Sequence, residues 1–170
     1  LTAGVLVLDD SEKRRAKTTK RIHGAHKVKD KKTGGYLNGQ SLIMLVLVTP
    51  VVTIPVGFGF YQPDPALTAW YKSDKKLKKQ GISKKERPPK PEKSTAYPTK
   101  QEIALQLLAK FKTDHAHLKI KAVLADTLYG TADFMGQAAA LFDQTQVISQ
   151  LRTNQLVRDK NRKTNLETYF

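Results

Sequence analysis

Apolar residues cluster in short runs along the chain, and two of these runs end in acidic residues. Residues 4–8 are followed by Asp9 and Asp10, and residues 120–125 are followed by Asp126. Short aliphatic and β-branched runs bounded by glycine or polar residues are typical of buried strands. Both runs are therefore predicted to be strands that carry a carboxylate to the point where the strand leaves the core.

The most apolar window, residues 41–60, predicts two more strands, at about 41–49 and 52–60, joined by a tight turn at Pro50. Prolines, glycines and threonines interrupt this window, which argues against a transmembrane segment. With the first strand, these two strands form a three-stranded meander.

Helical spacing of apolar residues appears twice after the meander. Residues 101–112 predict a helix that packs on the sheet through one apolar stripe, and residues 132–142 predict a second helix. A fifth strand is expected over 146–151. The polar tail that follows ends in 166–170, which could begin another strand.

Composition narrows the class of protein. The chain has 170 residues, of which 39% are hydrophobic, which is enough for one core and a single domain. The absence of cysteine excludes thiolate metal sites, disulfides and a cysteine nucleophile, and is compatible with a reducing cytoplasm. The chain opens on Leu1 with no visible signal peptide, and we expect it to be part of something longer.

Charge points to a polyanionic partner. Thirty basic and fifteen acidic side chains give a formal net charge of +15, for which nucleic-acid phosphates are the expected partner and an anionic membrane surface is the competing one. Residues 12–32 are predicted to form a basic loop that is either a solvated arm or a phosphate-contacting one. We expect DNA contacts from Lys13, Arg14, Arg15, Lys17, Lys20, Arg21, Lys27 and Arg152.

A second basic segment lies inside an insertion at about 63–100. Residues 71–100 are rich in lysine and proline and poor in apolar side chains, so we expect an exposed, partly mobile segment. It is either a solubilising linker or a strap over nucleic acid.

The two strand-terminal acids have two interpretations. Each aspartate alone could be a turn or helix-cap residue. If the two strands lie at one sheet edge, the carboxylates could instead share a divalent cation, because Mg²⁺ is a hard ion that binds one or two carboxylates.

The order of elements, three strands in a meander, helix, strand, helix, strand, is that of the α/β ribonuclease-H-like fold with its mixed sheet. In that fold the first and fourth strands are neighbours, so Asp10 and Asp126 would converge. Two segments also carry a family resemblance: residues 6–11, Leu-Val-Leu-Asp-Asp-Ser, and residues 123–130, Val-Leu-Ala-Asp-Thr-Leu-Tyr-Gly. They resemble the first- and second-aspartate motifs of DDE insertion-sequence transposases, in the group with the Tyr/Arg/Glu/Lys signature.

The resemblance implies catalytic and metal-ligand roles for Asp10 and Asp126, with Asp9 and Ser11 as possible supporting residues. It further implies two Mg²⁺ or Mn²⁺ ions in the complete enzyme and phosphoryl transfer that nicks transposon ends and joins them to target DNA. The implied setting is a homodimer of the full-length protein in the prokaryotic cytoplasm, associated with the nucleoid, with no membrane partner.

The chain departs from the family pattern at the third acid, a glutamate on a helix beyond the fifth strand. We therefore expect 1–151 to be a partial catalytic core and 152–170 to start a following insertion or truncated segment, with weak metal affinity and little or no strand transfer. The alternatives are a non-catalytic basic nucleic-acid-binding protein, or a nuclease or resolvase of the same fold.

Overall fold

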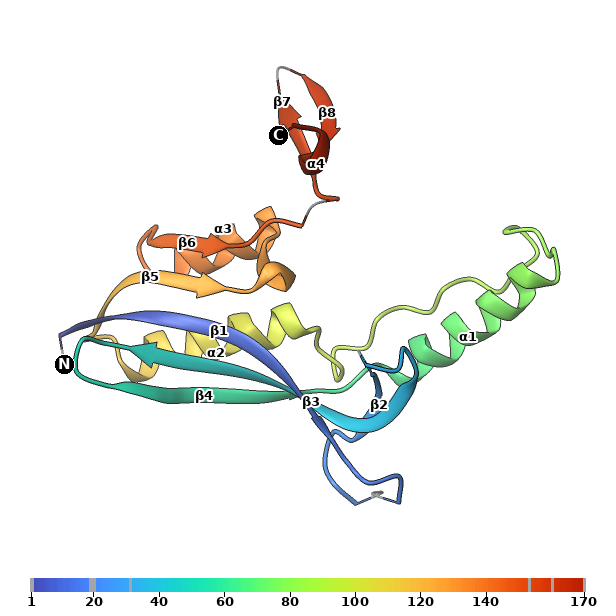
Figure 1. Ribbon diagram of the computed structural model, residues 1–170, viewed down its shortest axis with the longest axis horizontal. Coiled ribbons are helices and arrows are strands. Elements are labelled where there is room, and N and C mark those ends of the chain that lie inside the picture. The colour runs from blue at the N-terminus through green and yellow to red at the C-terminus, as the bar shows by residue number, and fades with distance from the viewer. Residues whose placement is uncertain (1, 19–20, 31, 153, 160, 170) are drawn as a thin grey trace. The chain divides into compact units, whose positions relative to one another are not determined.

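The structure is a computed structural model that describes residues 2–18, 21–30, 32–152, 154–159 and 161–169 (Figure 1). The chain divides into two compact units. The first comprises 1–11, 43–59 and 101–170, and the second comprises 12–42 and 60–100. None of the helices in the described part of the chain has the length and apolar character needed to cross a lipid bilayer.

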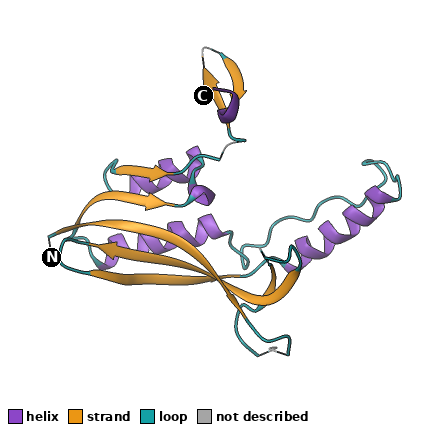
Figure 2. Ribbon diagram, viewed as in Figure 1, coloured by secondary structure: helices purple, strands orange, loops and turns teal. Residues whose placement is uncertain are grey.

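A mixed sheet runs through the fold (Figure 2). Its strand order is β2-β3-β1-β5-β6, and β4 also pairs with β3. The strands β5 and β6 continue the sheet in parallel from β1, whereas β2 pairs antiparallel with β3. The strands are β1 (Ala3–Arg14), β2 (His26–Lys29), β3 (Tyr36–Val48), β4 (Thr53–Tyr61), β5 (Lys119–Ala125) and β6 (Gln146–Ser149).

This architecture confirms the predicted α/β, ribonuclease-H-like fold. The predicted turn at Pro50 is also present, since the backbone N–H of Thr49 donates to the carbonyl of Val52 at 2.9 Å.

The first unit has its core between the sheet and two helices, α2 (Lys100–Asp114) and α3 (Ala132–Leu141). The helix α2 lies close to β4: a Cβ atom built on Gly59 would come within 2.5 Å of the Ile103 side chain. The predicted apolar stripe is the buried face of this helix. The fully or nearly fully buried side chains include Leu6, Leu8, Ile43, Leu45, Ile103, Leu108, Phe111, Val123, Phe134 and Ala138.

In the second unit, two predictions were wrong in part. Residues 12–32 are not a loop throughout, because β1 continues to Arg14 and β2 occupies His26–Lys29, where Val28 is buried. The segment after Pro63 contains a regular helix, α1 (Pro65–Lys79), in place of an irregular insertion. Its Asp64 cap and its contacts with the chain that follows supply order that the lysine-rich composition hides.

The C-terminal stretch also differs from its prediction. A small hairpin of β7 (Leu156–Asp159) and β8 (Arg162–Asn165) precedes a short helix, α4 (Leu166–Tyr169). Residues 166–169 are therefore helical and do not begin a strand; Phe170 lies outside the described residues.

Candidate active site

The strand β1 carries its two acids on opposite faces. Its side chains alternate, so that Leu6 and Leu8 are buried, Asp10 continues on their side and is half-buried, and Asp9 is exposed. The backbone N–H of Asp10 donates to Oδ1 of Asp9 at 2.8 Å. The strand does not end at these acids, as the sequence suggested, but continues through the exposed Ser11 to Arg14.

The register between β1 and β5 brings the acidic segments together. The two strands are parallel, and Leu8 is paired with Ala125. An aspartate follows each of these two residues in the sequence: Asp9 continues β1, and Asp126 comes directly after the end of β5. Because parallel strands point their carboxyl ends the same way, the acids of both segments lie at one end of this strand pair.

Asp126 also caps a short helix, η1 (Thr127–Tyr129). Its Oδ1 accepts from the backbone N–H of Thr127 at 2.5 Å and from the Thr127 hydroxyl at 3.2 Å. The Ser149 hydroxyl donates to the backbone carbonyl of Asp126 at 2.8 Å, which ties the end of β5 to β6. The cap interpretation of this aspartate is therefore correct as local structure, and the side chain nevertheless remains exposed.

Tyr129 ends η1, and its backbone N–H donates to the carbonyl of Asp126 at 2.9 Å. Its side chain is fully buried, and its hydroxyl has no hydrogen-bond partner among the described residues. Burial raises the pKa of the Tyr129 phenol strongly, and the negative charges of Asp10, Asp9 and Asp126 raise it further, in that order. The phenol is thus neutral at ordinary pH and buried without a hydrogen-bond partner among the described residues.

The aromatic packing around this phenol explains its burial. The Tyr129 ring lies 5.1 Å from the ring of Phe134, centroid to centroid, and Phe134 is itself buried in α3. The sequence motif of residues 123–130 contains Tyr129 but predicts no role for it; its position three residues after Asp126, within one helical turn, is the signal that could have identified it.

The donor chemistry of the site fits a hard divalent cation, since all its charged groups are carboxylates at one end of a parallel strand pair. Within the described ranges, however, no group of three acidic, histidine or cysteine side chains is arranged to hold a metal ion by itself. Mg²⁺ commonly takes one or two carboxylates and completes its shell with water and substrate phosphate.

Most of the predicted DNA-contacting side chains are exposed. In the second unit these are Lys13, Arg14, Lys17, Arg21 and Lys27, and in the first unit Arg152. Arg15 differs, because it is half-buried and its Nε donates to Oε1 of the buried Gln40 at 2.7 Å. Lys20 lies outside the described residues.

Comparison with known proteins gives one family. The sequence matches the family described as DDE superfamily endonuclease over residues 1–167, which is nearly the whole chain. A search of curated proteins finds no significant match.

Proposed function

Because the chain belongs to the DDE superfamily endonucleases, we propose that it is a transposase catalytic domain that cuts and joins DNA by metal-dependent phosphoryl transfer. The observation that supports this most directly is the register of β1 and β5, in which Leu8 pairs with Ala125 and an aspartate follows each of these residues in the sequence. Structural caps scattered over a basic protein would have no reason to follow two paired strands at the same end of the sheet.

In this proposal Asp10 and Asp126 hold the divalent cation, Mg²⁺ or Mn²⁺, with Asp9 and Ser11 in support. When bound, such an ion supplies a more acidic water or 3′-hydroxyl and stabilises the charge on the leaving oxygen of an in-line displacement. A complete site holds two ions and needs a further acid.

The chain's own residues prepare the carboxylates for this role. Bonds from Thr127 fix one oxygen of Asp126, and the bond from Ser149 fixes its backbone. The buried face of β1, formed by Leu6 and Leu8, leads directly to the half-buried Asp10. A charge beside an apolar interior interacts more strongly with a counter-charge than one surrounded by water, which favours cation binding at Asp10.

DNA, as transposon ends and target, is the substrate in this proposal. The exposed cations of residues 13–27 and Arg152 would contact phosphates, which position DNA without reading its sequence. Transposition brings two DNA ends together, and two-fold dimers are the commonest homo-oligomers, so the proposed active form is a homodimer of the full-length protein. Its proposed location is the prokaryotic nucleoid, where the DNA is.

The decisive experiment replaces Asp126 with asparagine in the full-length protein. Asp126→Asn should lower end cleavage in Mg²⁺ or Mn²⁺ at least about a hundredfold, because metal ions supply several kcal/mol of transition-state stabilisation. Its DNA affinity should stay equal or rise, since a negative charge near phosphate is removed. Asp10→Asn should behave in the same way.

Asp143→Asn is the matched control, since Asp143 is an exposed acid whose positive φ of 56° asparagine also tolerates. It should cleave DNA like the parent. If Asp126→Asn and Asp10→Asn also cleave like the parent, the enzyme proposal fails and a non-catalytic nucleic-acid-binding protein remains.

A further inference from the structure

The helix α1 has two chemically different faces. One face consists of half-buried side chains, among them Leu67, Trp70, Asp74 and Leu77. The other includes exposed lysines at positions i, i+3, i+4 and i+7, which places them on one side of a helix. We call these four residues the lysine face: Lys72, Lys75, Lys76 and Lys79.

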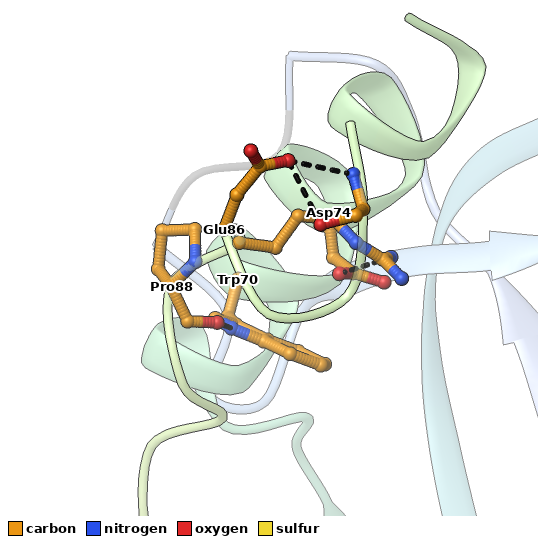
Figure 3. Close-up of polar contacts among 6 residues, drawn as sticks. Trp70, Asp74, Glu86 and Pro88 are labelled. Atoms are coloured by element: carbon orange, nitrogen blue, oxygen red, sulfur yellow. Dashed lines mark hydrogen bonds and ion pairs between the residues drawn. The ribbon is translucent and has the colours of Figure 1, made fainter. Parts of the chain in front are cut away.

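The half-buried face is held by the chain that returns after the helix, residues 83–94, which we call the strap. Trp70 donates from Nε1 to the carbonyl oxygen of Pro88 at 3.0 Å, and Arg87 forms a 2.7 Å ion pair with Asp74 (Figure 3). The Arg87 side chain is only 13% exposed in this pair. The strap therefore covers one side of α1 and leaves the lysine face open.

Both ends of this arrangement meet at the buried Asp64. Its Oδ1 caps α1 by accepting from the backbone N–H groups of Ala66 and Leu67, and its Oδ2 accepts from the backbone N–H of Ser94 at 3.2 Å. One carboxylate thus fixes the start of the helix and the end of the strap, so the lysine face is part of a closed, ordered element.

Three acids of this element are engaged away from the lysine face. Asp64 caps the helix, Asp74 pairs with Arg87, and Glu86 accepts from the Ser83 backbone N–H and hydroxyl. None of the ion pairs found among the described residues involves a lysine of the lysine face. Like charges at this spacing destabilise a helix by about 0.2–0.5 kcal/mol per pair, so the face is unfavourable until an anion binds it.

The chemistry of the covered face selects the kind of anion. A helix that binds an anionic membrane must insert a free apolar face into the lipid. In α1 the face opposite the lysines is occupied by the strap, so none remains to insert. A phosphate backbone requires only a row of cations, and four lysines span about 10 Å along a helix that rises 1.5 Å per residue.

We propose that the lysine face of α1 is a second DNA-binding surface, which contacts the phosphate backbone of duplex DNA independently of its sequence. The proposal rests on DNA being the substrate, as argued above, and it assigns part of the DNA affinity to residues outside the predicted contact set of residues 13–27 and Arg152.

The test measures binding to a duplex of unrelated sequence, without divalent metal, between about 50 and 200 mM salt. Changing all four lysines of the face to glutamine should weaken binding at least tenfold at the lower salt. The slope of log affinity against log salt should become shallower by about two to four, because each neutralised phosphate contributes about 0.9. Changing the same four lysines to arginine should preserve both values.

A control variant removes the same number of lysine charges from the other unit, where Lys110 and Lys112 are held in ion pairs with Asp114 and Asp143. This variant changes Lys110, Lys112, Lys119 and Lys121 together to glutamine, so it lowers the net charge without touching the lysine face. It should change the slope of log affinity against log salt by less than about one. Equal losses in the two quadruple variants would overturn the proposal, since binding would then follow total charge. Lysine-dependent binding to phosphatidylserine vesicles but not to DNA would overturn it as well.

A further pair of variants asks whether the helix matters or only its charges. Ser73 is exposed on α1, and Ser73→Pro should break the helix while it keeps every lysine. DNA affinity should then fall, whereas Ser73→Ala should bind like the parent. Parent-like binding by Ser73→Pro would show that the lysines act as a flexible tail, which contradicts the proposal.

None of these assays requires cleavage. If Asp126→Asn cleaves like the parent, the active-site proposal fails, but the lysine-dependent DNA binding can still be observed. If the lysine variants bind like the parent, the DNA-binding proposal fails, but the cleavage results do not change.

Discussion

Leu8 of β1 and Ala125 of β5 are partners in a parallel ladder, and an aspartate follows each of them in the sequence. This one register places acids from distant parts of the chain at the same end of two neighbouring strands. If the pairing of β1 with β5 shifted by one residue, the side chains of one strand would turn to the opposite face of the sheet. Asp10 would then no longer lie on the same side as the buried Leu6 and Leu8.

The strand pairing depends on buried leucine in β1. Leu6 is fully buried and lies in register with Val123, which is also fully buried. Leu6→Ala should lower the free energy of unfolding by about 2–5 kcal/mol, measured by urea denaturation. Leu124→Ala, at a position 36% exposed on the neighbouring strand, should cost clearly less. Equal losses would mean that Leu6 is not in the core.

Two glycines should respond to alanine with opposite signs. A Cβ on Gly130 would lie 2.8 Å from the carbonyl oxygen of Gln150, so Gly130→Ala should destabilise the protein by about 1–3 kcal/mol through overpacking. Gly136, inside α3, has no atom within 4 Å of such a Cβ, so Gly136→Ala should stabilise by about 0.5–1 kcal/mol. Thermal unfolding of both variants checks the pair. Stabilisation by Gly130→Ala would contradict the close approach of η1 to the chain after β6.

The Tyr129 phenol should ionise only in strong alkali. Burial, with the nearby carboxylates, raises its pKa above the ordinary 10.0. A raised pKa means that folding favours the protonated phenol, so this stabilisation is complete below about pH 10 and is lost as the pH rises through the folded-state value. Subtracting the alkaline absorbance titration of Tyr129→Phe from that of the parent isolates this group. A difference curve with its midpoint at or below pH 10 would contradict the buried site.

Removal of the Tyr129 hydroxyl should not harm stability. Since this hydroxyl is buried without a partner, Tyr129→Phe should leave the free energy of unfolding unchanged or raise it by about 1 kcal/mol. Urea denaturation at neutral pH measures this difference. A loss of stability would reveal a hydrogen bond to the hydroxyl.

Acid should loosen the helix and strap of the second unit through Asp64. Burial raises the pKa of this carboxyl, but hydrogen bonds from the backbone N–H groups of Ser94, Leu67 and Ala66 outweigh it and hold the pKa below the ordinary 3.8. The stabilisation is therefore present above pH 3.8 and is lost as the pH falls through the lowered value. Asp64→Asn, which can still cap the helix but does not titrate, should show less loss of helical circular dichroism in acid. Identical acid profiles would exclude Asp64 as the titrating group.

The sheet of the first unit was predictable because its signals are local. Apolar runs mark β1, β3, β4 and β5, and one apolar stripe marks α2. The two acids of interest could be found because they directly follow such runs. Their relation to Tyr129 could not, since it depends on strand register and on the packing of Tyr129 against Phe134.

The second unit was harder to predict because distant contacts stabilise it. The helix α1 has no fully buried residue, and its order comes from Asp64 and from the Arg87 and Pro88 contacts of the strap. In β2 only Val28 is buried, so basic side chains conceal the alternation of a short strand. For such elements, amino-acid composition predicts that the side chains are exposed, but it does not predict whether the backbone is helix, strand or loop.

The central place of β1 in the sheet has a consequence for biosynthesis. Its neighbours are β3, which follows soon in the sequence, and β5, which is translated much later. While the ribosome makes the intervening residues, one edge of a strongly apolar strand has no partner, and such edges invite pairing with other chains. Nascent polypeptides halted before β5 should therefore depend on chaperones for solubility, and should become independent of them once β5 has left the exit tunnel.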